Sequence, residues 1–360
     1  MSQVLLSSEP VETSITGAVA YRIRYRSSDT RGNATESTGF VVAPAAAGEN
    51  RKVMSWAHGT TGIGNAAAPS LVPNPASELS IYFSSEGDQQ IDYGVPGLQW
   101  FIDNDWVVVA TDYQGLGTKG VHHYSVNMTN GIDAVMIVHA AREMSVGAGT
   151  KFGLIGWSQG GGTVAGATEL DAQMYGDLEL VGAVAMSPGV TQFALKAAGL
   201  GASLAAGGTI PPDGHLYMML GALVSAFPDL VAYDDVFSPV GRDNFLKSYD
   251  TQPGHHMDDT IHRLNQHVGP VIVVDSAKVP DIAKAILEGS AGKRKPACPI
   301  LVQIDKQYEG PCPWAWQTGY IEAIKGFGGD VTSTEYPTAD HFALPGQGIA
   351  EAQQFLDSKF

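Results

Sequence analysis

FGLIGWSQGGG, residues 152–162, joins a short apolar run to a glycine-rich turn that carries one serine. The run 152–156 has the composition of a strand buried on both faces, and the small residues after it favour a helix. Residues 156–160 match the pattern G-x-S-x-G, in which the serine lies on a sharp turn between strand and helix. Such a turn exposes the hydroxyl, so Ser158 is a candidate nucleophile.

Strand and helix patterns alternate on both sides of this turn. Apolar or alternating runs predict strands at 18–28, 39–44, 52–59, 106–113, 180–187, 299–304 and 331–336. Helices are predicted at 130–144, directly after Ser158, at 314–326 and from about residue 347. Because buried strands joined by helices form parallel sheets covered on both faces, we predict an α/β fold with a mostly parallel, doubly wound sheet.

This alternation is interrupted between residues 190 and 295. That segment is rich in Ala, Gly, Met and aromatic residues, and it is too long and too apolar for a surface linker. We predict an inserted helical lid or cap domain at 190–295, and a core made of 1–189 and 296–360.

The composition excludes several classes of protein. The 360 residues include 21 basic and 37 acidic side chains, and the net charge of −16 disfavours nucleic-acid binding. No apolar run reaches the roughly 18 residues of a membrane helix, so stable membrane insertion is not expected. The start, MSQVLLSSEPVETS, does not resemble a signal peptide. We therefore expect a cytoplasmic protein, or alternatively a secreted one whose leader is absent from this sequence.

A serine nucleophile needs a base, and in folds with this turn an acid and then a histidine follow the serine along the chain. His341 is the only histidine after residue 267, and it lies in a loop ahead of the last predicted helix. The acid should follow the strand 299–304, where Asp305 and Glu309 are candidates. We favour Glu309 because it precedes a rigid Gly-Pro-Cys-Pro turn, and we interpret Asp340 as structural.

Stabilising the oxyanion of an acyl-transfer transition state requires backbone N–H donors. One is expected from Gln159, the residue after the candidate nucleophile, and the other from the loop after the strand 52–59, through Thr60 or Thr61. His58 lies in the same loop and is expected to brace it.

Several segments together resemble the secretory lipase (lipase A-like) family of α/β-hydrolases. They are SWAHGTTG (55–62), VVVATDYQGLGT (107–118) with HHY (122–124), GWSQGG (156–161), LVGAVAMSPG (180–189) and Asp-His at 340–341. The resemblance implies an α/β-hydrolase fold with an inserted helical lid, in a family that cleaves esters and acylglycerols and is usually secreted. It implies Ser158 as nucleophile, His341 as base and Thr61 as an oxyanion donor. The family's acid precedes a proline by four residues, and this spacing selects Glu309.

Other motifs have simpler interpretations. The pattern G-x-G-x-x-G at 115–120 is not followed by a helix start, so a dinucleotide site is not expected. The histidines between 255 and 267 lack a metal-binding spacing, and no metal or cofactor is expected. The methionine- and leucine-rich stripe at 218–223 fits either a lid surface or an internal core. Whether Cys298 and Cys312 pair stays open.

The sequence therefore predicts a serine carboxylic-ester hydrolase that forms an acyl-enzyme with small to medium acyl esters or acylglycerols. The expected partner is a small-molecule ester. One alternative is an acyltransferase that uses the same residues with an alcohol acceptor. Another is a non-catalytic binding protein with the same fold.

Overall fold

A computed structural model describes residues 3–196, 200–306 and 310–360. Its main sheet has nine strands in the order β1-β2-β3-β5-β4-β6-β7-β10-β11. They are β1 (Leu5–Val11), β2 (Ala18–Ser28), β3 (Ala34–Pro44), β4 (Arg51–Ala57), β5 (Val107–Thr111), β6 (Ala148–Trp157), β7 (Glu179–Met186), β10 (Ile300–Asp305) and β11 (Val331–Tyr336). A second, two-stranded sheet pairs β8 (Gly208–Ile210) with β9 (Ile272–Val274).

The main sheet has an antiparallel edge and a parallel body. Strands β1, β2 and β3 form an antiparallel meander, and β3 pairs antiparallel with β5. From β5 through β4, β6, β7 and β10 to β11, every neighbouring pair is parallel. The carboxyl ends of six strands therefore meet at one edge, which is where open α/β sheets place their ligands.

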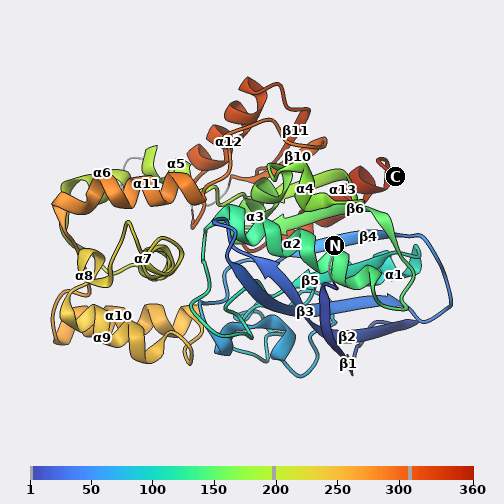
Figure 1. Cartoon of the computed structure of the whole chain (residues 1–360), viewed down its shortest axis with the longest axis horizontal. Helices are drawn as coiled ribbons and strands as arrows, with labels where there is room; N and C mark the ends of the chain where they lie inside the picture. Colours follow the sequence, from blue (N-terminus) through green and yellow to red (C-terminus); the bar gives the residue numbers. More distant parts are fainter. Residues whose placement is uncertain (1–2, 197–199, 307–309) are drawn as a thin grey trace.

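Helices cover both faces of the sheet (Figure 1). Those outside the insertion are α1 (Leu98–Asp103), α2 (Asn127–Arg142), α3 (Gln159–Thr168), α4 (Ala172–Tyr175), α12 (Trp314–Gly326) and α13 (Leu344–Asp357), with short 3-10 turns at Asn65–Ala67 and Pro69–Leu71. Along β4, Val53 packs with residues of α2 and α3, whereas Met54 packs with residues of α1 and α13. Both faces of the strand are buried, which explains its continuous apolar sequence.

Between β7 and β10 the chain forms a helical insertion. It contains α5 (Thr191–Lys196), α6 (Leu200–Ala206), α7 (Gly214–Ala226), α8 (Tyr233–Val236), α9 (Pro239–Ser248), α10 (Gly254–His267), a 3-10 turn at Ser276–Lys278 and α11 (Val279–Gly289). Helices α6 to α11 stand beside the sheet, away from both chain ends (Figure 1). A second hydrophobic cluster, which includes Tyr217, Phe245 and Ile261, lies mainly in the insertion and extends to the loops that contain Ile63 and Val121.

The elements agree closely with the sequence predictions where the pattern is regular. The strand at 18–28 and the helix at 314–326 have the predicted bounds. Strand β1, the helix α1 and the small β8–β9 sheet are additional elements, and β1 is a largely exposed edge strand whose sequence carries no apolar alternation. Over the described ranges, no helix combines the length and apolar character needed to cross a membrane.

Glycines allow α2 and α3 to pack closely, and this contact supports the helix that follows Ser158. A Cβ atom added at Gly131 of α2 would lie 2.4 Å from the backbone nitrogen of Ala167. A Cβ atom at Gly166 of α3 would lie 2.1 Å from the backbone oxygen of Asn127. Both distances are too short for a side chain, so the two helices can approach this closely only with glycine at these positions.

We therefore predict that Gly131→Ala destabilises the fold by about 1–3 kcal/mol, because the added methyl group must push α2 away from α3. The measurement is the free energy of unfolding from denaturant titration. Gly326→Ala is the matched control, since a Cβ atom there meets nothing within 4 Å at the exposed end of α12. The control should be neutral or slightly stabilising, and equal stability of the two variants would contradict the packing argument.

Candidate active site

Ser158 lies on a strained turn between β6 and α3, with φ of 60° and ψ of −117°. A Cβ atom at Gly160 would lie 1.8 Å from the backbone oxygen of Ala57, and one at Gly156 would lie 2.3 Å from the backbone oxygen of Gly160. Both glycines of the G-x-S-x-G pattern are therefore required by close backbone contacts. The Ser158 N–H donates to the carbonyl of Met186 at 2.9 Å, which joins the turn to the neighbouring strand β7.

His341 lies within hydrogen-bond distance of this serine. Its Nε2 atom is 2.9 Å from Ser158 Oγ, and both side chains are buried. The residue lies between β11 and α13, and its carbonyl accepts a hydrogen bond of 2.8 Å from the indole of Trp157. The neighbouring Asp340 accepts from the backbone N–H groups of Phe342 and Ala343, which stabilises the loop.

Two side chains lie near the other ring nitrogen of His341. The Nδ1 atom is 3.0 Å from Ser187 Oγ and 3.8 Å from Asp305 Oδ2. Asp305 ends β10, and its other oxygen accepts from the Gln317 amide at 2.8 Å. Burial by itself would raise the pKa of Asp305, but the contacts with His341, Ser187 and Gln317 outweigh it and lower this pKa. Glu309, the acid favoured from the sequence, lies outside the described residues.

The predicted oxyanion residues lie beside the serine and in the loop after β4. Gln159 is the first residue of α3 and lines the cavity at Ser158. Thr60 Oγ1 is 2.9 Å from the hydroxyl of Tyr124, and the Thr61 hydroxyl is buried with no hydrogen-bond partner among the described residues. Backbone N–H groups at the start of a helix have no acceptor within that helix, so the Gln159 N–H is available to a ligand.

Two buried histidines brace this region through their ring nitrogens. His122 Nδ1 is 2.8 Å from the Gln114 carbonyl, and its Nε2 is 2.7 Å from the amide nitrogen of Gln159. His58 contacts the carbonyls of Gly59 and Asp112. Burial lowers the pKa of His58 to about 4 and that of His122 to about 3, so both rings stay neutral near pH 7. The contact between His122 and Gln159 is not predicted by the sequence analysis, although the motif HHY marks the segment.

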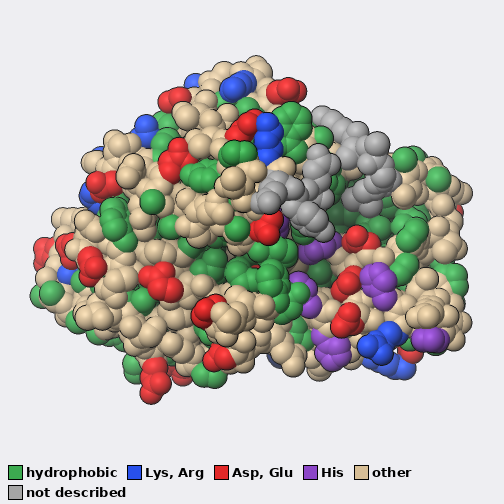
Figure 2. Space-filling model, turned by 180° about the vertical axis from the view of Figure 1, so that it is seen from behind, with side chains coloured by type: hydrophobic (Ala, Val, Ile, Leu, Met, Phe, Trp, Pro, Cys, Tyr) green, Lys and Arg blue, Asp and Glu red, His purple; other side chains and the backbone are tan. Residues whose placement is uncertain are grey.

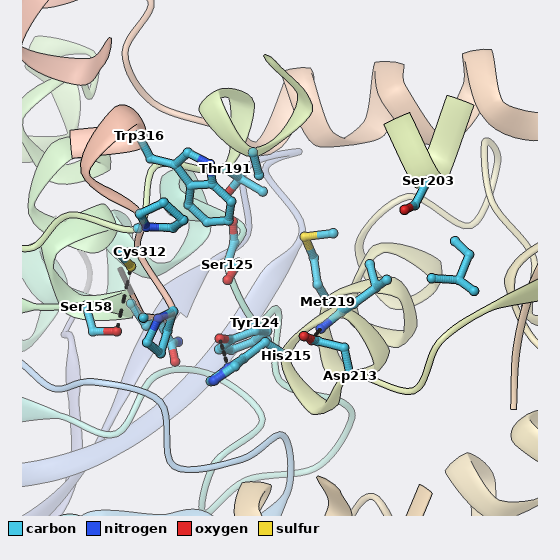
Figure 3. A pocket seen from close by; sticks show the side chains of 18 of the residues that line it. Tyr124, Ser125, Ser158, Thr191, Ser203, Asp213, His215, Met219, Cys312 and Trp316 are labelled. Atoms are coloured by element: carbon cyan, nitrogen blue, oxygen red, sulfur yellow. Dashed lines mark hydrogen bonds between the residues drawn. The ribbon is translucent and has the colours of Figure 1, made fainter. Parts of the chain in front are cut away.

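A cavity of about 440 Å³ opens at Ser158. Its walls come from the strand ends, from the loop before α12 and from the insertion, and they include Tyr124, Gln159, Thr191, Ile210, His215, Met219, Cys312 and Trp316. Ser158 lies toward one end of this group and Ser203 toward the other, with Met219 between them (Figure 3). On the face seen in Figure 2, histidine and acidic side chains gather around a hollow. The predicted stripe at 218–223 is divided, because Met219 lines the cavity while Met218, Leu220 and Leu223 lie in the core of the insertion.

Other candidates from the sequence lie apart from this site. The glycine pattern 115–120 forms a turn after β5, with φ of 82° at Gly115 and 74° at Gly117, and no helix begins directly after it. Among the residues that the structure describes, no group of three or more His, Cys, Asp or Glu side chains is arranged to hold a metal ion. Cys298 and Cys312 are both buried and unpaired, and Cys312 Sγ lies 4.0 Å from Ser158 Oγ.

The secretory lipase family matches residues 89–230, a segment that contains the Ser158 turn and the loop 112–126. The resemblance to secretory lipases is confirmed. This family match identifies the chain as a carboxylic ester hydrolase. Among curated proteins, no sequence relative matches significantly.

Solved structures confirm the fold of this ester hydrolase. The rice cell wall degrading esterase LipA from Xanthomonas oryzae is similar with a TM-score of 0.76 and 15% identity, over 100% of both chains. Candida antarctica lipase A in its closed state is similar with a TM-score of 0.73 and 16% sequence identity, over 100% of this chain and 82% of that chain. A putative hydrolase from Legionella pneumophila is similar with a TM-score of 0.69 and 18% sequence identity, over 99% of this chain and 98% of that chain. At these identities the likeness establishes the α/β-hydrolase fold.

The two buried cysteines, one in the core and one at the site, provide a test of the structure. Burial raises the pKa of both thiols to about 12, and only a thiolate reacts quickly with disulfide reagents. We predict that Ellman's reagent at pH 8 reacts slowly with the native protein and titrates two thiols after unfolding. The unfolded Cys298→Ala variant should have one thiol that reacts with the reagent. Rapid reaction in the native state, or no thiols in the unfolded and unreduced protein, would contradict the structure.

Proposed function

We propose that the protein hydrolyses carboxylic esters through a covalent acyl-enzyme formed on Ser158. The observation that carries the proposal is the 2.9 Å contact between Ser158 Oγ and His341 Nε2 at the cavity wall. A serine hydroxyl needs an adjacent base to become a nucleophile, and a neutral imidazole within this distance is such a base.

In the proposed reaction His341 Nε2 accepts the Ser158 proton while Oγ attacks the ester carbonyl carbon. The carbonyl oxygen gains negative charge, and the backbone N–H groups of Gln159 and of the loop containing Thr60 and Thr61 stabilise it. When the tetrahedral intermediate collapses, the imidazolium returns its proton to the leaving alcohol. Water then attacks the acyl-enzyme with the same base, which releases the carboxylic acid and restores Ser158.

Asp305 is the acid that we assign to this site. Its carboxylate lies 3.8 Å from His341 Nδ1, and the contacts that lower its pKa keep it ionised near neutral pH. A buried negative charge at this distance stabilises the imidazolium that forms during proton transfer. This assignment replaces the preference for Glu309 based on the spacing to proline.

The cavity supports esters with small to medium acyl groups as substrates. Its volume of about 440 Å³ lies within the range of small-molecule sites, and side chains of Ala194, Ile210, Leu216 and Met219 give it apolar walls. These residues belong to the segment 190–295, so the insertion supplies one wall of the site as an acyl-binding lid domain would.

The first test is Ser158→Ala measured with p-nitrophenyl esters of increasing acyl length. We expect kcat/KM to fall by a factor on the order of 10⁴ or more for every ester, because the substitution removes the hydroxyl that lies beside His341 Nε2 at the cavity wall. Ser55→Ala is the matched control, since Ser55 is a buried serine in β4 whose hydroxyl donates to the Ala134 carbonyl. Retention of activity by Ser158→Ala would refute the proposal.

The second test separates the two acid candidates. Asp305→Asn should lower kcat by about 10² to 10⁴ because the imidazolium loses its buried counter-charge. Glu309→Gln should leave kcat close to that of the wild type. Both variants are measured under the same conditions with one short-chain ester. The reverse pattern would assign the role to Glu309.

A further inference from the structure

Ser187 is a buried serine directly after β7, and no functional role was predicted for it from the sequence. Its side chain and backbone have no exposed surface, and its φ is 44°. The Ser187 N–H donates to the carbonyl of Gln303 in the neighbouring strand β10 at 2.8 Å. Positive φ is strained for a residue with a Cβ atom, so a serine held in this conformation invites a functional explanation.

The hydroxyl of Ser187 lies closer to the imidazole than the carboxylate does. Ser187 Oγ is 3.0 Å from His341 Nδ1, whereas Asp305 Oδ2 is 3.8 Å away. A nitrogen and an oxygen 3.8 Å apart do not form a direct hydrogen bond. Asp305 Oδ2 is buried and accepts no hydrogen bond from any described residue. The His341 ring and, to a smaller extent, the Ser187 hydroxyl both lower the pKa of Asp305, so the carboxylate remains coupled to the ring by charge.

We propose that Ser187 is a positioning residue that accepts the Nδ1 proton of His341 and so holds the ring with Nε2 facing Ser158. The inference rests on the proposed function, because it assigns His341 the role of base. When the proton is on Nδ1, the lone pair of Nε2 is free to accept the Ser158 proton. Asp305 then acts on the imidazolium through its charge, while the direct hydrogen bond is made by the hydroxyl.

Titratable groups near the ring include Asp305 at the end of β10, the Cys312 thiol beside Ser158, Asp340 in the same loop, and His215 of α7, whose pKa is lowered by burial. Burial raises the pKa of Cys312 to about 12, so this thiol stays neutral in the working range. A change in the titration of the base after substitution of Ser187 therefore reports on the Nδ1 contact.

The experiment compares Ser187→Ala with Ser187→Gly. Both variants remove the hydroxyl, but glycine adopts positive φ without strain, so the pair separates the hydroxyl from the backbone. We expect kcat to fall about tenfold or more in both variants, since a hydrogen bond to a group that becomes charged is lost. KM should change little because Ser187 does not line the cavity. Ser55→Ala serves again as the buried-serine control.

The pH profile provides a readout that a merely structural role would not change. The acid limb of kcat/KM reports the pKa of the base in the free enzyme. An imidazolium without an acceptor at Nδ1 loses its proton more readily, so the acid limb should move to lower pH in both variants. An unchanged limb would overturn the proposal. An acid limb at higher pH would also overturn it, because it would mean that Asp305 takes over the contact with Nδ1. Normal activity of Ser187→Gly, with low activity of Ser187→Ala, would overturn it as well.

A spectroscopic measurement tests the proposal even if both Ser187 variants fail to fold. In protein labelled with ¹⁵N-histidine, the Nδ1–H proton of His341 should be protected from exchange in the wild type and also in Asp305→Asn. Loss of this protection in Asp305→Asn would show that the carboxylate, and not the Ser187 hydroxyl, holds the Nδ1 proton. That result would overturn the proposal. Activity of Ser158→Ala is measured separately, so failure of the proposed function is distinguished from failure of the Ser187 assignment.

Discussion

The strained backbone at Ser158 is the constraint on which the other parts of the site depend. Positive φ turns the chain from β6 into α3, and the turn fits only because Gly156 and Gly160 let the backbone approach Ala57. The hydrogen bond from Ser158 to Met186 ties the turn to β7. The same contacts bring the serine to the carboxyl edge of the sheet, where Asp305 at the end of β10 and His341 in the loop after β11 lie beside it. Strain at one residue is tolerated because the surrounding backbone leaves it no other conformation.

Buried imidazoles divide into two kinds around this turn. The rings of His58 and His122 lie within hydrogen-bond distance of backbone carbonyls or an amide, and burial lowers the pKa of each. They hold the loops on either side of Gln159 without adding charge to a site of low polarity. His341 differs because its two nitrogens contact hydroxyl groups and an ionised carboxylate lies nearby. The nearby carboxylate of Asp305 stabilises a transient positive charge on this ring.

The insertion and the sheet contribute different properties to the site. The sheet supplies Ser158, Ser187 and Asp305 from strand ends, so their spacing depends on strand pairing and changes little with side-chain packing elsewhere. The insertion supplies residues such as Ile210 and Met219 from a unit whose side chains pack mainly in a second hydrophobic cluster. Substitutions in this unit can therefore change the shape of the cavity while the reacting groups keep their geometry.

Local pattern and chain order determined much of this protein by themselves. The apolar strands, the turn at Ser158 and the candidate role of His341 could be predicted from the sequence, because each depends on short-range periodicity or on the order of elements in the chain. Only the tertiary structure decided which side chains meet at His341. Asp305 ends one parallel strand and Ser187 directly follows the end of its neighbour, and the 118 positions that separate them in the chain hide that proximity. Strand pairing sets such distances through hydrogen bonds between remote segments, which no local pattern encodes.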